Sequence, residues 1–399
     1  MSEQVAHRDT LAWRSRRTLA LACGAHALHD GFTDLLYVLL PIWQAEFGLG
    51  YAAVGLLRGL YAGTMAGLQL PAAMLADRLG GPGLLALGTA LAGLGYAVAG
   101  SGGGLAALMI ALVIGGCGSS VQHPIGADLV ARAFAGRHSR IALARYNFAG
   151  DLGKMTLPAA GAFLVAVMPW RRTTFLLAAL AVVAAGLILT MGRDIGEGPP
   201  PADAEAREAA VTAPGRGFPL LLAIGVIDSA TRMGFLTFLP FLLRLKGASL
   251  PLIGTALTLV FAGGAAGKLV CGPLGVRLGA IPSVCVTEAL TAAGIALLLP
   301  LPLGAALALL PLLGIMLNGT SSVLYGTVPE LVRPEHRQRA FSLFYTGAIG
   351  SGALSPALYG LVSDDIGVPG MMGLIAGIVL LTLPLAWALR PALRRPAEL

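Results

Sequence analysis

The sequence predicts an all-helical membrane protein in which twelve transmembrane helices form two pseudo-symmetric bundles of six. Of its 399 residues, 56% are hydrophobic and only 12% are charged, a composition far from that of soluble domains. Apolar stretches long enough to span a bilayer recur along the whole chain. The two halves also repeat one another at a constant offset, since Leu40 and Pro41 recur as Leu239 and Pro240 and segment 75–80 recurs as 274–279. In transporters, membrane repeats of this kind enclose a substrate site near the bilayer midplane.

Each expected span is an apolar run bounded by polar or Gly/Pro breaks, which membrane helices tolerate because small residues favour close packing. The first bundle is expected at residues 18–192, after a cytoplasmic segment 1–17. A polar, proline-rich cytoplasmic linker, 193–217, leads to the second bundle, 218–389, and a cytoplasmic tail, 390–399. The expected spans are 18–44, 52–76, 83–101, 105–131, 139–167, 172–192, 218–243, 250–276, 281–299, 304–329, 338–363 and 369–389.

The distribution of basic residues predicts a multi-pass protein of the inner (plasma) membrane with both termini in the cytoplasm. Most of the 27 Lys and Arg residues then lie in inner segments. The outer segments hold only Arg171, Arg172, Arg244 and Lys246. This distribution also accounts for the net charge of +7 without nucleic-acid binding, so the expected partners are lipid, protons and a small-molecule substrate.

No cofactor, metal or enzymatic activity is expected. The four cysteines have no metal-ligand spacing and are expected to be packing residues rather than a disulfide framework. The chain has no phosphate-binding loop of the G-x-x-x-x-G-K-[ST] type, which argues against ATP-driven pumping. It also lacks G-x-S-x-G and H-E-x-x-H motifs. One chain is sufficient for the expected mechanism, so a functional monomer is predicted.

Ionisable residues inside apolar spans are the strongest functional signal, because each costs a few kcal/mol at the centre of a membrane helix. His26, Asp30, Asp34 and Tyr37 follow helical spacing and form one stripe on the first span. A proton-carrying carboxyl group must change its protonation state as its surroundings change. The proton-coupling candidates are Asp30, Asp34, Asp151 and His26. The alternative is that the aspartates are locked in ion pairs with Arg145, Lys154 or Arg232.

Three cations in the spans favour an anionic or zwitterionic substrate, although they could instead compensate the aspartates. The spacing allows Asp151 to pair with Lys154 and Asp228 with Arg232. The substrate-binding candidates are Tyr37, Gln122, Arg145, Asn147, Lys154, Asp228, Arg232, Asn318 and Tyr325.

Other polar residues are expected to be structural. His123, beside Pro124, is expected at a helix bend. Arg58 is expected to snorkel toward the outer surface. Lys268 and Glu288 could neutralise one another.

A set of charges at the cytoplasmic ends of the spans is expected to form a latch between the halves, a two-state element of the kind that gating requires. The gating candidates are Asp77, Arg78, Asp128, Arg132, Arg277, Glu330 and Arg333.

Several motifs resemble those of the major facilitator superfamily. Leu75, Ala76, Asp77, Arg78 and Gly80 match its motif between helices 2 and 3, from which Ala73, Gly81 and Pro82 depart. Gly153, Pro158 and Gly161 match a helix 5 motif of its antiporters, whereas Leu157 and Ala162 do not. Trp170, Arg171 and Phe175 resemble a further signature at the start of helix 6.

Within that superfamily, the chain is most similar to the fosmidomycin resistance protein family. The shared residues are His26, Asp30, Leu39, Leu40 and Pro41, then Gln122, His123, Pro124 and Leu129 to Arg132, then Phe238, Leu239 and Pro240. The resemblance implies the major facilitator fold, with helices 1, 4, 7 and 10 around a central site, and proton-driven efflux of a drug. An uptake symporter or a uniporter for a small organic acid, sugar or metal-chelating metabolite is the alternative, because it would use the same fold and most of the same charges.

Overall fold

The computed structural model describes residues 2–134, 136–193, 217–332 and 336–394, and within these residues it contains helices and no strand. The predicted all-helical fold class is therefore confirmed for the described part of the chain. The helices are α1 (Ser2–Phe47), α2 (Tyr51–Leu79), α3 (Gly81–Gly100), α4 (Gly104–Ser119), α5 (Gln122–Ala133), α6 (Gly136–Val167), α7 (Trp170–Gly192), α8 (Phe218–Leu245), α9 (Leu250–Leu278), α10 (Ala280–Leu298), α11 (Leu303–Thr327), the short 3₁₀ helix Val328–Glu330, α12 (Arg337–Val379) and α13 (Thr382–Arg394).

Every expected span overlaps one of these helices, with differences at the ends. Eight segments of the described residues are long and apolar enough to cross a membrane. The charged helices α1, α2 and α6 fall outside this set, and α12 and α13 are counted in it as one segment. The number of twelve spans therefore stays a prediction. The helix α1 also begins at Ser2, within the segment 1–17 that was expected to precede the first span.

Prolines explain where two expected spans are divided. The span 105–131 breaks after Ser119, where Pro124 lacks an amide hydrogen and its ring would clash with the carbonyl group four residues earlier. The span 369–389 breaks between α12 and α13, where Pro384 has the same effect. A further kink in α12 lies at Gly367, whose φ of 75° is outside the helical region.

The sequence repeat corresponds to a repeat in backbone structure. Gly80 ends α2 with φ 71° and ψ 148°, and its repeat equivalent Gly279 ends α9 with φ 85° and ψ 162°. An L side chain is strained at such φ values, so glycine allows the same tight connection to form in both halves. Equivalent prolines, Pro41 and Pro240, likewise lie inside α1 and α8.

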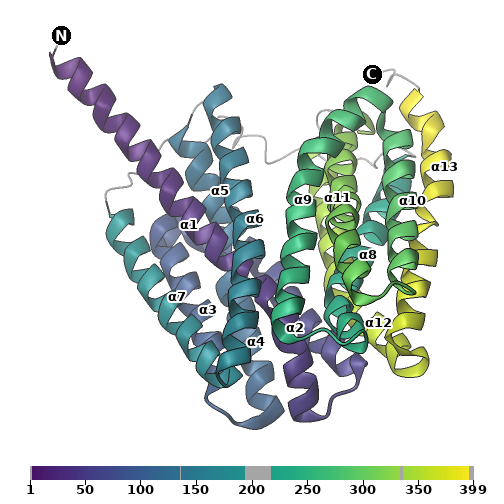
Figure 1. The fold of residues 1–399 in the computed structure, drawn as a ribbon. Coiled ribbons are helices and arrows are strands. Elements are labelled where there is room, and N and C mark those ends of the chain that lie inside the picture. Colours follow the sequence, from purple (N-terminus) through teal and green to yellow (C-terminus); the bar gives the residue numbers. More distant parts are fainter. Residues whose placement is uncertain (1, 135, 194–216, 333–335, 395–399) are drawn as a thin grey trace. The chain divides into compact units, whose positions relative to one another are not determined.

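The described helices divide into two compact units (Figure 1). The first unit contains residues 1–39 and 60–206, and the second contains residues 40–59 and 207–399. In the first unit, α3 packs against α4 and α7. In the second unit, α9 packs against α11 and α8 against α12. The end of α1 and the beginning of α2 thus belong to the second unit, although sequence order suggested that they would stay with the first bundle.

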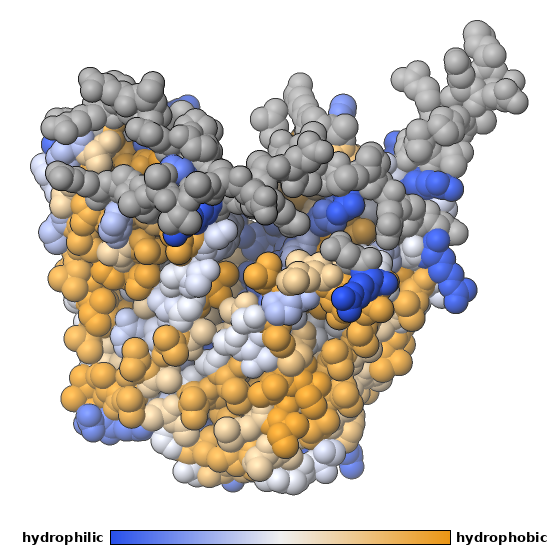
Figure 2. Space-filling model, turned by 180° about the vertical axis from the view of Figure 1, so that it is seen from behind, coloured by the Kyte–Doolittle hydropathy of each residue, from blue (hydrophilic) through white to orange (hydrophobic). Residues whose placement is uncertain are grey.

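Apolar side chains cover much of the surface that Figure 2 shows, and hydrophilic side chains gather toward its two ends. Leu70 on α2 and Leu269 on α9, which are equivalent in the repeat, are 72% and 76% exposed. Exposed apolar surface of this extent is expected where helices face lipid.

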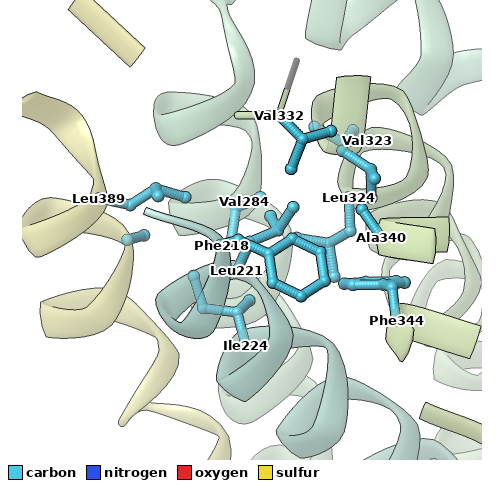
Figure 3. Close-up of a cluster of buried hydrophobic side chains, with 12 residues drawn as sticks. Phe218, Leu221, Ile224, Val284, Val323, Leu324, Val332, Ala340, Phe344 and Leu389 are labelled. Atoms are coloured by element: carbon cyan, nitrogen blue, oxygen red, sulfur yellow. The ribbon is translucent and has the colours of Figure 1, made fainter. Parts of the chain in front are cut away.

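A buried apolar cluster holds α8, α10, α11, α12 and α13 together in the second unit (Figure 3). Phe218, Leu221 and Ile224 on α8 contact Val284 on α10, and Leu389 on α13 closes the cluster. Burial of a side chain of this size stabilises a packed core by roughly 1.5–3 kcal/mol in water, and in lipid the same contacts act through close packing.

Residues 40–59 are fastened to the second unit by polar contacts. The Asp364 carboxylate on α12 accepts hydrogen bonds from the backbone amides of Tyr51, at 2.6 Å, and Ala52, at 2.9 Å. These amides form the first turn of α2, where the helix dipole also favours a negative charge. In addition, Arg244 donates a hydrogen bond to the Pro41 carbonyl oxygen at 3.2 Å.

We expect Asp364→Ala to lower the free energy of unfolding by about 1 kcal/mol, because two amides at the start of α2 lose a charged acceptor. The matched control is Asp365→Ala, which removes the neighbouring exposed carboxylate but leaves these hydrogen bonds in place. Thermal unfolding of both purified variants in detergent checks the prediction. Equal unfolding curves for the two variants would contradict it.

Candidate functional site

The first unit contains a cluster of four ionisable side chains around Asp30. The Asp30 carboxylate on α1 lies 3.2 Å from His26 Nε2, 3.3 Å from Lys154 Nζ on α6 and 3.8 Å from His123 Nε2 on α5. The side chains of His26 and Asp30 are 5% and 9% exposed, whereas those of Lys154 and His123 are 31% and 45% exposed. The cluster therefore has a buried end and an accessible end.

Hydrogen bonding fixes the proton on one nitrogen of His26. Its Nδ1 lies 2.9 Å from the Tyr146 backbone carbonyl, which can only accept, so Nδ1 carries a hydrogen. The other nitrogen, Nε2, faces the Asp30 carboxyl group. A neutral imidazole and a charged carboxylate would turn two lone pairs toward each other at 3.2 Å, so this contact requires one further proton between Nε2 and Oδ2.

Neighbouring residues hold His26 in this orientation. Its ring stacks on Tyr146 with the ring centroids 4.1 Å apart. The Tyr146 hydroxyl donates a hydrogen bond to the Gln122 backbone carbonyl oxygen at 3.1 Å. It accepts a hydrogen bond from the side-chain amide nitrogen of Gln122 at 3.2 Å. A Cβ atom at Gly150 would lie 2.6 Å from an Asp30 carboxylate oxygen and 2.7 Å from His26 Nε2. Glycine at that position on α6 therefore leaves the space that the pair occupies.

His26, Asp30 and His123 also have the donor atoms of a metal site, with one ligand atom from each lying within 4.8 Å of the others. However, the Lys154 ammonium group lies 3.3 Å from the same carboxylate. A metal ion would have to compete with this cation for Asp30, so the donor set fits a proton better than a divalent metal.

A second charged cluster lies in the second unit. Asp228 on α8 and Glu288 on α10 are 6% and 1% exposed, and the two acids lie close enough to interact electrostatically. Arg232, one turn along α8, interacts electrostatically with both acids. The sequence predicted the pair of Asp228 and Arg232, but Glu288 was expected beside Lys268. Glu288 lies near Asp228, Arg232 and Thr320, and its pairing with Lys268 stays a prediction.

The structure places the remaining candidates in different surroundings. Asp34, Asp151 and Tyr37 are buried in the first unit, and Arg145 and Asn147 are exposed on α6. Lys154 forms an ion pair with Asp30, whereas the spacing suggested Asp151 as its partner. Asp151 is also near enough to interact electrostatically with Lys154.

On α11, the Asn318 side chain donates to the Gly314 carbonyl oxygen at 3.1 Å, as a helix-internal contact. Tyr325 stacks on Tyr345 with the ring centroids 4.7 Å apart.

Of the gating candidates, Asp128 and Arg132 form an ion pair of 2.7 Å along α5. Arg78, Arg277 and Glu330 are exposed. Arg333 and the side chain of Asp77 lie outside the described residues. The latch itself therefore stays a prediction.

Sequence reasoning missed three members of these clusters. His123 was interpreted as a bend residue, but its Nε2 lies close to Asp30. Tyr146 received no role, and Glu288 was considered only as a partner of Lys268, not of Asp228 or Arg232. The prediction that Arg58 snorkels is wrong, because the side chain is only 2% exposed.

We expect Asp30 and Lys154 to be energetically coupled. Asp30→Asn and Lys154→Gln should each destabilise the protein, because each leaves one partner of a largely buried ion pair uncompensated. The double variant should lose less than the sum, with a coupling energy of about 0.5–3 kcal/mol.

Unfolding titrations of the four proteins in mixed micelles measure this coupling energy. Lys154→Gln combined with Asp365→Asn, which lies in the other unit, is the control pair and should be additive. Additivity for Asp30 and Lys154 as well would rule out the ion pair as a stabilising contact.

Comparison with known proteins agrees with the fold described above. The sequence profile of the Major Facilitator Superfamily matches residues 22–224 and again residues 221–399. The fosmidomycin resistance protein of Escherichia coli (strain K12) is 24% identical over 389 residues, which cover 92% of this chain and 93% of that protein. The resemblance to that family is thus confirmed.

Solved transporter structures share the fold. A bacterial homologue of the human lysosomal transporter Spinster, in an inward-facing and unoccupied conformation, gives a TM-score of 0.80 at 16% identity, over 95% of this chain and 98% of that chain. A POT family transporter in complex with 5-aminolevulinic acid gives a TM-score of 0.78 at 12% identity, over 95% and 97% of the two chains. The profile matches extend over both halves of the sequence, so the chain belongs to the Major Facilitator Superfamily of membrane transporters.

Proposed function

We propose that this transporter is a proton-coupled efflux protein of the inner (plasma) membrane, with both termini in the cytoplasm and a single chain as the working unit. Its substrate is a small drug-like or anionic metabolite. Alternating access through two membrane repeats provides the transport mechanism.

The observation that carries the proposal is the contact between His26 Nε2 and Asp30 Oδ2, which requires a proton. A buried carboxyl group that shares a proton with a histidine and also contacts a lysine has two alternative partners of different charge. Loss of the proton would strengthen the pair of Asp30 with Lys154, and gain of a proton would weaken it. Protonation at Asp30 can thus control whether the Lys154 ammonium group is available to another anion.

Lys154 and His123 support an anionic substrate. Their side chains form the accessible end of the cluster, at 31% and 45% exposure. An ammonium group with three donors and an imidazole beside it can bind a phosphonate, phosphate or carboxylate. A relative of this chain is named a fosmidomycin resistance protein. Fosmidomycin is a phosphonate, and its negative charge is complementary to the Lys154 ammonium group.

Two observations favour export over uptake. The relative that covers nearly the whole chain is a resistance protein. The glycine and proline residues of α6, Gly153, Pro158 and Gly161, also match the antiporter motif in helix 5. The proposed exchange moves a proton inward as the substrate leaves.

We expect Asp30→Asn to reduce proton-driven transport to the level of empty liposomes, because an asparagine cannot release a proton. Exchange of labelled for unlabelled substrate across the membrane should continue, since exchange needs no net proton movement. Both rates are measured in proteoliposomes, with and without an imposed pH gradient.

Asp34→Asn is the comparison, because Asp34 lies one turn along the same helix and is equally buried. Loss of coupling in Asp34→Asn with retention in Asp30→Asn would transfer the proton site to Asp34. Gradient-driven accumulation that survives in both variants would favour a uniporter and contradict the proposal.

A further inference from the structure

Three hydroxyl groups form a hydrogen-bonded chain across the first unit. Thr33 Oγ1 on α1 lies 3.2 Å from the Tyr61 hydroxyl oxygen on α2, and that oxygen lies 2.6 Å from Ser119 Oγ on α4. Tyr61 and Ser119 are buried, at 4% and 2% exposure, whereas Thr33 is half-buried. The hydroxyl chain therefore has a buried end at Ser119 and an accessible end at Thr33.

Close packing of two helices holds the middle of the hydroxyl chain in place. A Cβ atom at Gly116 on α4 would lie 2.7 Å from the Tyr61 carbonyl oxygen, and one at Gly115 would lie 3.1 Å from the Tyr61 ring. Glycine at both positions lets α4 approach α2 closely. The Tyr61 ring is thus confined, and its hydroxyl group keeps its position between Ser119 and Thr33.

The count of hydrogens gives the hydroxyl chain a direction. A buried hydroxyl group normally donates its hydrogen, because an unsatisfied buried donor is costly. Tyr61 is the partner that the described residues supply to the Ser119 hydroxyl group. Ser119 then donates to Tyr61, and Tyr61 can donate to Thr33. The Thr33 hydroxyl group receives a hydrogen bond from inside the unit and keeps its own hydrogen for an acceptor at the accessible end.

Thr33 shares a helix face with the Asp30 cluster. It is three residues beyond Asp30 on α1, which places it on the same face and about 4.5 Å further along the helix axis. The other residues of segment 31–39 are buried, so Thr33 is where this part of α1 stays accessible. Lys154 and His123 form the accessible end of the Asp30 cluster. A molecule whose anionic group binds Lys154 and His123 can thus present a second polar group to Thr33.

We propose that Thr33 is a specificity-determining residue of the substrate site and donates a hydrogen bond to a neutral oxygen of the substrate, such as a hydroxyl or carbonyl oxygen. This oxygen lies about 5 Å, one helical turn, from the anionic group of the same molecule. The three hydroxyl groups carry no charge to compensate a second anion, so they suit a neutral oxygen. Tyr61 and Ser119 are positioning residues, because they act on the substrate through Thr33. The inference rests on the proposed function, from which it takes the anionic substrate at Lys154 and His123.

Binding of two matched phosphonates to the purified protein in detergent tests this role without a proton gradient. The compound (3-hydroxypropyl)phosphonate contains a hydroxyl group three carbons from the phosphonate, and propylphosphonate lacks it. We expect the wild type to bind the hydroxylated compound about tenfold more tightly, the effect of one well-placed hydrogen bond. Thr33→Val should remove this preference and leave the affinity for propylphosphonate unchanged. Isothermal titration calorimetry measures both affinities.

Two control variants accompany Thr33→Val. Thr33→Ser should keep the preference, because serine retains the hydroxyl group. Thr190→Val changes an exposed threonine of α7 in the same unit and should bind both compounds as the wild type does. If Thr33→Val does not fold, Tyr61→Phe replaces it and should weaken the preference, because the Thr33 hydroxyl group loses the partner that orients it.

Three results would overturn the role of Thr33. An equal loss of affinity for both phosphonates in Thr33→Val would indicate that the hydroxyl chain only holds helices together. A preference that survives in Thr33→Val would place the selecting group elsewhere. Binding of both compounds by the wild type without any preference would contradict this inference but not the anionic substrate, whereas binding of neither compound would refute both.

Discussion

The high cost of an uncompensated charge in a membrane interior constrains the whole arrangement of polar residues in this protein. Asp30 lies among His26, His123 and Lys154, which come from three different helices. Each charge in that set has a partner of opposite or adjustable charge within 4 Å. The same constraint brings Arg232 to the two acids of the second unit. Charge compensation therefore decides which helix faces meet in the interior of each unit.

Such compensation requires helices that approach closely, and glycine makes the approach possible. A Cβ atom at Gly153 on α6 would overlap the Ala27 carbonyl group on α1, one turn from the Asp30 cluster. Gly150 leaves space for the Asp30 carboxylate itself. Helix contacts in a membrane depend on packing and hydrogen bonds rather than on the hydrophobic effect, so small residues at these two positions are part of the site.

Two clusters, one in each unit, place buried carboxyl groups beside a cation, Lys154 in the first and Arg232 in the second. A change of protonation alters the net charge of a cluster by one. The energetic cost of one uncompensated charge in a membrane interior is at least as large as the free energy that usually separates two conformations of a protein. In the proposed function, a proton gradient uses this energy to drive conformational change.

Local sequence features predicted the position of each helix and the face on which its polar residues lie. They did not predict which side chains of different helices come into contact. Apolar runs indicated the spans, and the repeat related segments 75–80 and 274–279, which end at Gly80 and Gly279 with positive φ in both halves. The spacing of Lys154 suggested Asp151 as its partner, but Asp30 on another helix is the recorded ion pair. Similarly, nothing near Glu288 in the sequence indicated Asp228. A single sequence gives the face on which a residue lies, but not the helix that packs against that face.

The sequence also did not predict that residues 40–59 belong to the second unit. This placement depends on Asp364, an exposed aspartate that has no distinguishing feature in its own segment, and on the start of α2 more than three hundred positions earlier. Arg58 illustrates the same limit, since its side chain is buried although its place in the sequence suggested exposure.

The most direct test of the account is proton movement in proteoliposomes that contain the wild-type protein and an internal pH indicator. Fosmidomycin is added first, followed by matched anionic, neutral and cationic compounds. The account predicts proton flux that depends on an anionic compound and is absent from protein-free liposomes. Movement of an anionic compound without any accompanying proton flux would contradict the central claim that the Asp30 cluster couples the two.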